Sequence, residues 1–186
     1  RLDILPWCLL LMSSTSYAFH VGCTGIILPN PHLPRDNPAS FLEMSTVDEA
    51  ASHQITRSIE DDGNYDVVEV DLADGRNYPI YIGTDFTNEQ ISKILTNHIH
   101  GKQVLIITND RIAPIGYLEK YEKLLESHKE VHTLVLPDGE ANKKLETLQL
   151  ILDKSLREKL DRKCTFVALG GGVIGDMAGF AAAIYQ

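Results

Sequence analysis

Hydrophobic and polar residues follow a regular pattern only from about residue 65 of this 186-residue chain. Apolar residues within 67–72 are separated by acidic ones, Asp74-Gly75 follows, and 78–82 is again rich in apolar and aromatic residues. Alternation on both sides of a turn-forming pair is typical of a β-hairpin. The regular part of the chain is therefore predicted to open with such a hairpin.

Strand-like and helix-like segments then alternate to the end of the chain. The continuous apolar runs 104–107 and 166–169 predict strands that are buried on both faces, as in a parallel sheet. Alternating strands and helices predict an α/β fold, Rossmann-like and doubly wound, with a mostly parallel sheet. Ligands of this fold bind at the carboxyl ends of the strands. The expected segments are a helix from about Asn88 to Gly101, a strand at 104–108, a helix at 117–127, a strand at 131–136, a helix at 143–160, a strand at 165–169 and a helix through 177–183.

Residues 1–64 show neither a helix period nor a strand period. They contain three arginines and no lysine, and prolines cluster between residues 29 and 38. The apolar run from Ile4 to Met12 has the length of a signal-peptide core and is too short to span a membrane. Small residues up to Ala18 suit signal-peptidase cleavage. We expect residues 1–64 to be a targeting or disordered extension with a signal-like part at 1–18, and residues 65–186 to form one domain; a leader without function is the alternative.

The segment Tyr17-Ala18-Phe19 resembles the bipartite plastid presequence of algae with secondary plastids, in which Phe follows the signal-peptide cleavage site. Seven acidic residues between 19 and 64 count against this interpretation, because transit peptides are poor in acids. The expected location is the plastid, with the cytoplasm as the alternative.

Composition and charge exclude several classes of function. The net charge of −9 argues against a nucleic-acid partner, which would require clustered Lys and Arg. The apolar segments predict no stable membrane association. Three cysteines without a C-x-x-C spacing suggest neither a disulfide framework nor a zinc site, and the spacing of the histidines favours no metal site.

A glycine-rich loop follows the last predicted strand. Residues 170–176 read Gly-Gly-Gly-Val-Ile-Gly-Asp, and the glycines at 170, 172 and 175 fit G-x-G-x-x-G between a strand and a helix. Such glycines let a pyrophosphate approach the backbone amides at the positive end of a helix. A tight turn without a ligand is the alternative. Asp176 is expected in the first helical turn, where it could stabilise the helix or accept a hydrogen bond from a cofactor.

A second polar loop follows the strand at 131–136. It reads Pro137-Asp138-Gly139-Glu140, with Lys143 three residues further on. The pattern is a turn signal, and Glu140 and Lys143 could simply form an exposed ion pair. Alternatively, Glu140 could bind ribose hydroxyls while Lys143 meets a phosphate or carboxylate. The loop is expected at the same sheet edge as the glycine-rich loop, which favours the functional interpretation.

Together, the segments 136–143 and 168–185 closely resemble the two amino-terminal signatures of the 3-dehydroquinate synthase family, and the resemblance covers residues 65–186. The resemblance implies that the chain binds NAD and that it contains no catalytic residue. Residue by residue, the implied cofactor contacts are Asn109, Asp138, Gly139, Glu140, Lys143, Gly171, Gly172, Val173, Ile174, Gly175 and Asp176.

The resemblance also implies an activity for the complete enzyme. That family converts 3-deoxy-D-arabino-heptulosonate 7-phosphate, a phosphorylated sugar acid, to 3-dehydroquinate in the shikimate pathway, with NAD acting catalytically. A divalent metal, zinc or cobalt, is expected only in the full-length enzyme, because the family's metal ligands lie in a helical carboxyl-terminal domain that this chain lacks. We therefore expect an inactive amino-terminal fragment of an enzyme that is a homodimer at full length.

Three alternatives remain at this point. Another sugar-phosphate cyclase would differ mainly in residues beyond this chain. An iron-dependent polyol dehydrogenase shares the architecture, but its glycine-rich loop carries Ser and Lys where this chain has Val173 and Gly179. A stand-alone nucleotide-binding module is the non-enzymatic alternative.

Overall fold

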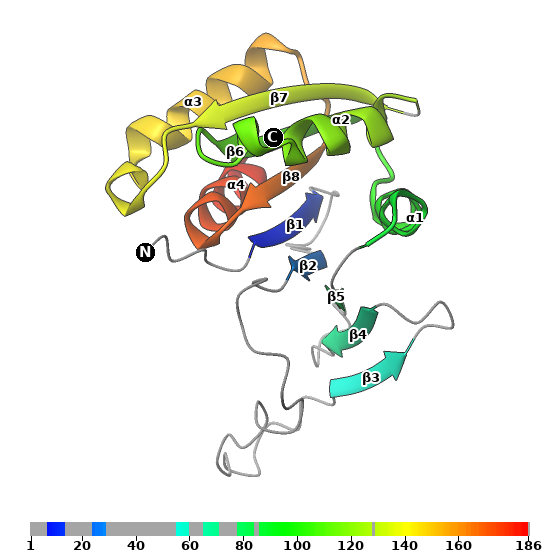
Figure 1. Ribbon diagram of the computed structural model, residues 1–186. Helices are drawn as coiled ribbons and strands as arrows, with labels where there is room; N and C mark the ends of the chain where they lie inside the picture. Colours follow the sequence, from blue (N-terminus) through cyan, green and yellow to red (C-terminus); the bar gives the residue numbers. More distant parts are fainter. Residues whose placement is uncertain are drawn as a thin grey trace, which may run out of the picture.

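The computed structural model describes residues 7–13, 24–28, 55–59, 65–70, 78–83, 86–127 and 129–185, the first three ranges by their backbone alone. These residues form one eight-stranded sheet with helices packed against it (Figure 1). The strand order is β3-β4-β5-β2-β1-β8-β6-β7. The strands are β1 (Trp7–Ser13), β2 (Thr24–Leu28), β3 (Ile55–Ile59), β4 (Tyr65–Val70), β5 (Tyr78–Gly83), β6 (Gln103–Asn109), β7 (Glu130–Leu136) and β8 (Thr165–Gly170).

Two parts of the sheet differ in strand direction. β6 runs parallel to both of its neighbours, β7 and β8, and these three strands form the carboxyl-terminal end of the sheet. β4 and β5 form the antiparallel hairpin, with Tyr65 opposite Gly83 and Val70 opposite Tyr78. The α/β architecture with parallel strands and an opening hairpin, predicted from the hydrophobic pattern, is thus confirmed.

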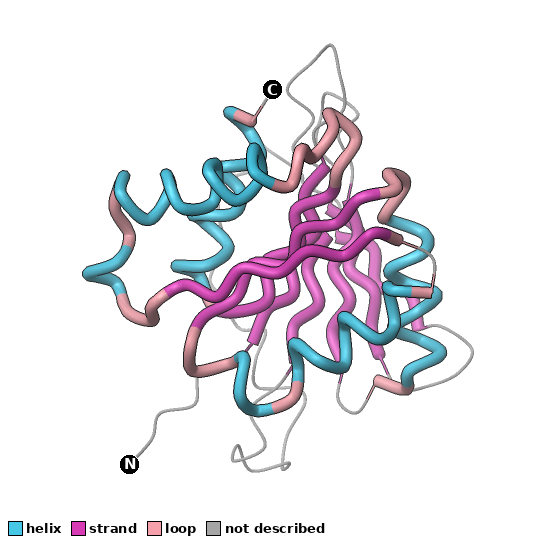
Figure 2. The backbone as a smooth tube through the Cα atoms, turned by 90° about the horizontal axis from the view of Figure 1, so that it is seen from above, coloured by secondary structure: helices cyan, strands magenta, loops and turns pink. Residues whose placement is uncertain are grey.

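Helices cover both faces of the parallel strands (Figure 2). On one face, α1 (Asn88–His98) and α2 (Tyr117–Glu126) pack against Val104 and Ile106 of β6. On the other face, α3 (Leu145–Arg157) and α4 (Gly172–Ile184) pack against Leu105 and Ile107. Successive side chains of a strand point to opposite faces, so a strand between two helical layers must be apolar throughout. All four of these β6 side chains are completely buried.

Local signals explain where α1 begins and why the chain is tightly packed after it. Thr87 caps α1: its hydroxyl accepts a hydrogen bond from the Gln90 amide, and the Gln90 side chain accepts one from the Thr87 amide. This reciprocal capping box satisfies two amides that the helix itself leaves unpaired. Just beyond the helix, a Cβ atom on Gly101 would lie only 1.8 Å from the carbonyl oxygen of Lys163. Only glycine therefore fits where the chain enters β6.

The predicted start of the helix after β7 differs from the structure. A helix was expected from residue 143, but α3 begins at Leu145 because Glu140–Asn142 first forms a short 3-10 helix, η2. Lys144 then adopts an extended backbone as the N-cap of α3. The chain between the end of β7 and the start of α3 is therefore a loop at the sheet edge that contains η2.

Most of the predicted extension 1–64 lies outside the described residues, including the expected cleavage site after Ala18. Three of its segments are present as strands β1, β2 and β3 of the sheet. The division of the chain at residue 64 stays a prediction.

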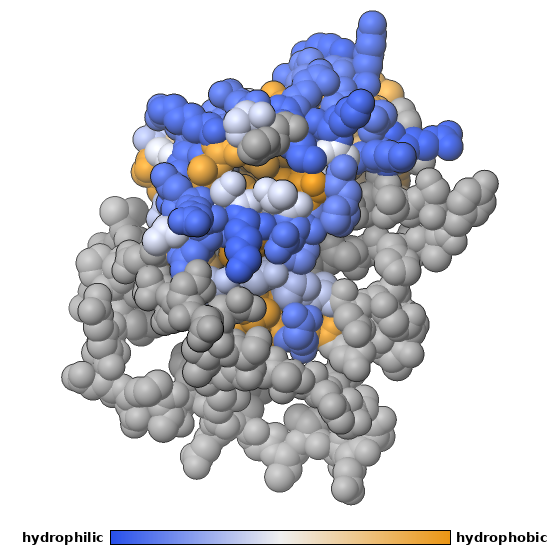
Figure 3. Space-filling view, turned by 90° about the vertical axis from the view of Figure 1, so that its right-hand side faces the viewer, coloured by the Kyte–Doolittle hydropathy of each residue, from blue (hydrophilic) through white to orange (hydrophobic). Residues whose placement is uncertain are grey.

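The surface of the described part is mainly hydrophilic, with apolar residues visible between the charged ones in the side view of Figure 3. None of the helices in that part combines the length and hydrophobicity that a membrane span requires.

Candidate functional site

The carboxyl ends of the three parallel strands meet at one edge of the sheet. Asn109 at the end of β6 lies opposite Leu136 at the end of β7, and Thr108 lies opposite Leu169 of β8. The Thr108 hydroxyl also donates a 2.8 Å hydrogen bond to the Leu169 carbonyl. The three loops that follow these strands are therefore neighbours. α2 and α4, which come after β6 and β8, lie on opposite faces of the sheet, and such a reversal opens a ligand crevice between the two strands.

The glycine-rich loop connects β8 to α4 at this edge. Gly170 has little room for a side chain, since an added Cβ would lie 3.0 Å from the side chain of Ile174, which would have to shift slightly. A Cβ on Gly171 or Gly172, by contrast, would meet nothing within 4 Å. The backbone here borders open space rather than neighbouring atoms. A bulky, flat or anionic ligand could therefore approach it closely.

The amino end of α4 is suited to an anion. Gly171 is the N-cap, and no side chain among the described residues bonds to the amides of the first turn. The partial positive charge of such a helix end attracts phosphate groups. The uncapped amides and the open space above the two glycines fit the pyrophosphate of a dinucleotide.

Asp176 lies elsewhere than the sequence suggested. It was expected in the first turn of the helix, but that turn, which starts at Gly172, contains no acidic residue. The prediction was wrong because the glycine-rich loop itself bends into the helix and moves its start forward. Asp176 therefore falls in the second turn, beyond the reach of the uncapped amides.

Lys143 joins the second polar loop to the glycine-rich loop. Its Nζ atom lies 2.7 Å from Oδ2 of Asp176 and 3.9 Å from Oε1 of Glu140. The hydrogen bond and charge of Asp176, with a smaller effect of Glu140, raise the pKa of the Lys143 ammonium. The lysine is thus held in its charged form between two loops that are 33 residues apart in sequence. The ion pair expected from the Glu140–Lys143 spacing is thus present, at 3.9 Å, and the binding of a ligand by these two residues stays a prediction.

Gly139 gives the second loop its shape. Its φ of 103° lies in the left-handed region, which side-chain-bearing residues rarely adopt. The turn leads directly into η2 and leaves the carboxylate of Glu140 exposed to solvent. Glu140 is therefore free to reorient toward a ligand at the sheet edge.

Asn109 at the end of β6 and Asp138 in the loop after β7 lie next to each other. The Asn109 Nδ2 atom donates a 2.7 Å hydrogen bond to Oδ1 of Asp138, although the two residues are 29 positions apart. Arg111, which the sequence analysis did not single out, completes this group with its Nε atom 3.0 Å from Oδ2 of Asp138. The only sequence signal for Arg111 was its place two residues after the end of β6.

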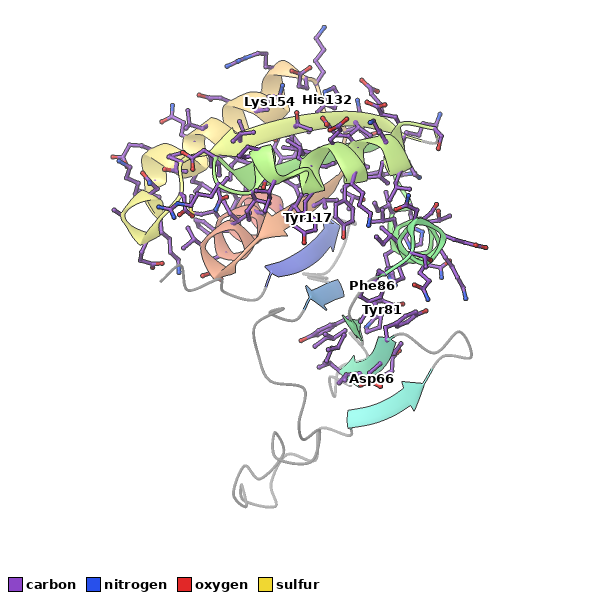
Figure 4. The ribbon with its side chains drawn as sticks, in the orientation of Figure 1. Asp66, Tyr81, Phe86, Tyr117, His132 and Lys154 are labelled. Carbon is purple, nitrogen blue, oxygen red and sulfur yellow. The ribbon has the colours of Figure 1, made fainter. Side chains whose placement is uncertain are left out.

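Other reactive side chains in the described part of the chain are engaged elsewhere or inert. No group of three or more His, Cys, Asp or Glu side chains there could hold a metal ion. His132 lies between Glu130 and Glu158, and Figure 4 shows it beside Lys154 over β7. Burial raises the pKa of the Cys164 thiol to about 12, which makes it a poor nucleophile. The described residues at this sheet edge thus fit a dinucleotide, and no cluster in the described part fits a metal.

Several known proteins that are similar to this chain are named 3-dehydroquinate synthase. Residues 133–186 match the family model described as 3-dehydroquinate synthase N-terminal. The chain is 47% identical to the chloroplastic 3-dehydroquinate synthase of Arabidopsis thaliana over 79% of its own length and 34% of the relative's. It is 55% identical to the 3-dehydroquinate synthase of Pseudomonas aeruginosa strain LESB58, over 64% of this chain and 31% of that protein.

The chain spans about a third of the length of the curated relatives that it matches. Among solved structures, it resembles 2-deoxy-scyllo-inosose synthase in complex with carbaglucose-6-phosphate, NAD+ and Co2+, with a TM-score of 0.47 and 23% sequence identity. That match covers 51% of this chain and 27% of the other. The family model and the sequence identities of 47% and 55% confirm the resemblance of the motifs to the amino-terminal part of 3-dehydroquinate synthases.

Proposed function

We propose that this chain, a homologue of the amino-terminal part of 3-dehydroquinate synthases, forms the NAD-binding part of such an enzyme. The observation that carries the proposal is the meeting of three elements at one sheet edge: the uncapped amino end of α4, the open Gly171-Gly172 backbone and the Lys143 ammonium. Identities of about half over most of the chain support the same assignment.

Each proposed contact follows from the geometry of its loop. The backbone of Gly171, Gly172, Val173, Ile174 and Gly175 faces the pyrophosphate, whose charge the helix end stabilises. Lys143 supplies a full positive charge next to the same helix. Glu140 accepts hydrogen bonds from ribose hydroxyls, as carboxylates do in related dinucleotide sites. Asp176 holds Lys143 in place and, with Gly139, borders the cofactor.

The proposed reaction of the complete enzyme is the conversion of 3-deoxy-D-arabino-heptulosonate 7-phosphate to 3-dehydroquinate and phosphate. When bound, NAD supplies a transient oxidation of a substrate hydroxyl group. The residues described here bind and orient the cofactor. Residues outside this chain would hold the substrate and a zinc or cobalt ion, and the complete enzyme is proposed to act as a homodimer.

A plastid location is proposed for the protein. The plant relatives from Arabidopsis thaliana and Solanum lycopersicum are named chloroplastic, and the segment Tyr17-Ala18-Phe19 has the form of a cleavable plastid presequence. Residues 1–64 would then act as the targeting extension.

Replacing Glu140 with Gln tests the cofactor site. The substitution keeps the size of the side chain but removes the charge that strengthens hydrogen bonds to ribose hydroxyls. We expect the affinity for NAD to fall about tenfold, as for the loss of a charge-assisted hydrogen bond. Isothermal titration calorimetry of the full-length protein with NAD measures the change.

Glu119→Gln serves as the matched control. Glu119 is also an exposed glutamate paired with a lysine, 2.6 Å from Lys123, but both residues of this pair lie on α2 and the pair joins none of the three loops to another. Its replacement should leave the affinity for NAD unchanged. Equal NAD binding by Glu140→Gln and the wild type would remove Glu140 from the site, and a wild-type protein that binds no NAD would overturn the proposed function.

A further inference from the structure

The side chains of Asn109 and Asp138 are bonded to each other and to their own loops. Asn109 is only 5% exposed, and its Nδ2 atom donates to Oδ1 of Asp138 at 2.7 Å. Its Oδ1 atom accepts a 3.0 Å hydrogen bond from the backbone amide of Ile112. Because the oxygen must face that amide, the nitrogen must face Asp138. Both ends of the Asn109 amide are thus used within the protein.

Asp138 is engaged through its carboxylate and its backbone alike. Oδ1 accepts from Asn109, and Oδ2 lies 3.0 Å from Nε of Arg111. The Asp138 backbone amide donates to Oδ1 of Asp110 at 3.2 Å, and its carbonyl oxygen accepts from Nδ2 of Asn142 at 2.6 Å. Contacts with Asn109, Asp110 and Arg111 all cross from the loop after β7 to the loop after β6. Asp138 therefore connects the loop after β6 to the loop after β7. The pairing of β6 with β7 fixes these loops only where they leave the strands.

From these contacts we infer that Asn109 and Asp138 are positioning residues, which lock the loop after β6 to the loop after β7 and act on the cofactor only through Glu140. This inference rests on the proposed function. Gly139 and Glu140 directly follow Asp138. A fixed position of Asp138 therefore also fixes the backbone position from which the Glu140 side chain extends. Arg111 balances the charge of Asp138 and belongs to the same group.

Turning the Asp138 carboxylate away from Asn109 toward a cofactor would have a high energetic cost. Each carboxylate oxygen can accept a second hydrogen bond, but the bond to Asn109 would be lost if the side chain turned. The Nδ2 group of Asn109 would then be left without that acceptor in a buried place, which is unfavourable for any hydrogen-bonding group. Glu140, in contrast, can turn toward a ligand at the cost of one long contact of 3.9 Å.

Exchanging Asn109 and Asp138 distinguishes a positioning role of Asp138 from a direct contact between its carboxylate and NAD. Asn109→Asp alone places two carboxylates face to face. We expect it to weaken NAD binding on the order of tenfold, as when a buried hydrogen bond is lost and a like charge is added. In the double variant Asn109→Asp/Asp138→Asn, the side chain at 138 donates to the new carboxylate at 109. That carboxylate still accepts from the Ile112 amide, and Arg111 keeps an acceptor.

The double variant should therefore bind NAD almost as well as the wild type, with its thermal midpoint restored as well. If Asp138 contacted the cofactor with its own charge, the double variant would bind as poorly as Asn109→Asp, and that result would overturn the inference. Gln103→Ala is the control, because Gln103 joins Glu130 across β6 and β7 at the opposite end of these strands, and it should leave NAD affinity unchanged.

A wild-type protein without NAD affinity would instead refute the proposed function. The thermal midpoints would still decide whether the loops are locked together. A double variant that is no more stable than Asn109→Asp would show that the Asn109–Asp138 bond does not connect them.

Discussion

At the residue scale, His98 links the hairpin to α1 through a bond that depends on its protonation. The Tyr81 hydroxyl lies 2.9 Å from Nε2 of His98, and the two rings pack edge to face with centroids 5.7 Å apart. Partial burial, and then the charge of His100, lower the pKa of the His98 imidazole below its ordinary value. The folded state therefore favours the neutral ring, which can accept a hydrogen bond from Tyr81.

The free energy of unfolding should consequently fall as the solution becomes acidic. Above the ordinary histidine pKa of 6.5, His98 is neutral in both states and its contribution is complete. As the pH falls through that value, the unfolded state takes up a proton first, so the folded state loses stability. Urea unfolding from about pH 7 to about pH 5 should show a steeper loss for the wild type than for His98→Gln. Parallel curves for the two proteins would contradict the prediction.

Individual site residues were predictable to the extent that sequence spacing determines their position. Glu140 and Lys143 were paired correctly because residues three apart share one side of a helical turn, and η2 provides that turn. Arg111 was missed because only the folded loops bring it to Asp138. Asp176 was assigned to the wrong turn of the helix because the run of glycines does not indicate at which residue the helix begins.

At the scale of elements, the capping box of α1 should contribute measurably to stability. The Thr87 hydroxyl accepts from the Gln90 amide at 3.2 Å, and α1 carries Ile91 and Leu95 into the core beside the sheet. Thr87→Ala removes this acceptor and should lower the free energy of unfolding by about 1 kcal/mol. Thr87→Ser keeps the hydroxyl and should change stability much less. Chemical denaturation of both variants tests this, and equal losses would show that the hydroxyl bond is unimportant.

Elements whose character depends on local pattern were predicted well, and those that depend on distant contacts were not. β6 and β8 follow from uninterrupted apolar runs, since both faces of each strand are covered by helices. The start of α3 was misplaced because Glu140–Asn142 forms a 3-10 turn in a loop that Asn109 and Arg111, both far away in sequence, hold through Asp138. The order of strands in the sheet likewise depends on pairing between residues far apart in sequence.

At the scale of the whole molecule, β1 connects the parallel strands to the rest of the sheet. It pairs antiparallel with β8, from Cys8 opposite Gly170 to Ser13 opposite Thr165, and with β2 on its other side. Cleavage after Ala18 would remove β1 entirely. β8, which is buried along its whole length, would then present an unpaired edge of the kind that readily adds another strand. A targeting role and a structural role for residues 7–13 therefore exclude each other in the mature protein.

The small residues before Ala18 and the phenylalanine after it favour targeting, so we expect the mature protein to lack residues 1–18. Mass spectrometry of amino-terminal peptides from protein isolated from its own cells identifies the first residue directly. If β1 belongs only to the precursor, a variant lacking residues 1–18 should bind NAD as tightly as the uncleaved protein, because the three loops of the site come from β6, β7 and β8. Mature peptides that contain Trp7–Ser13, or a loss of NAD affinity on truncation, would instead make β1 a permanent part of the sheet. The edge of β8 would then be closed by the chain's own amino terminus, and the plastid presequence would have to be abandoned.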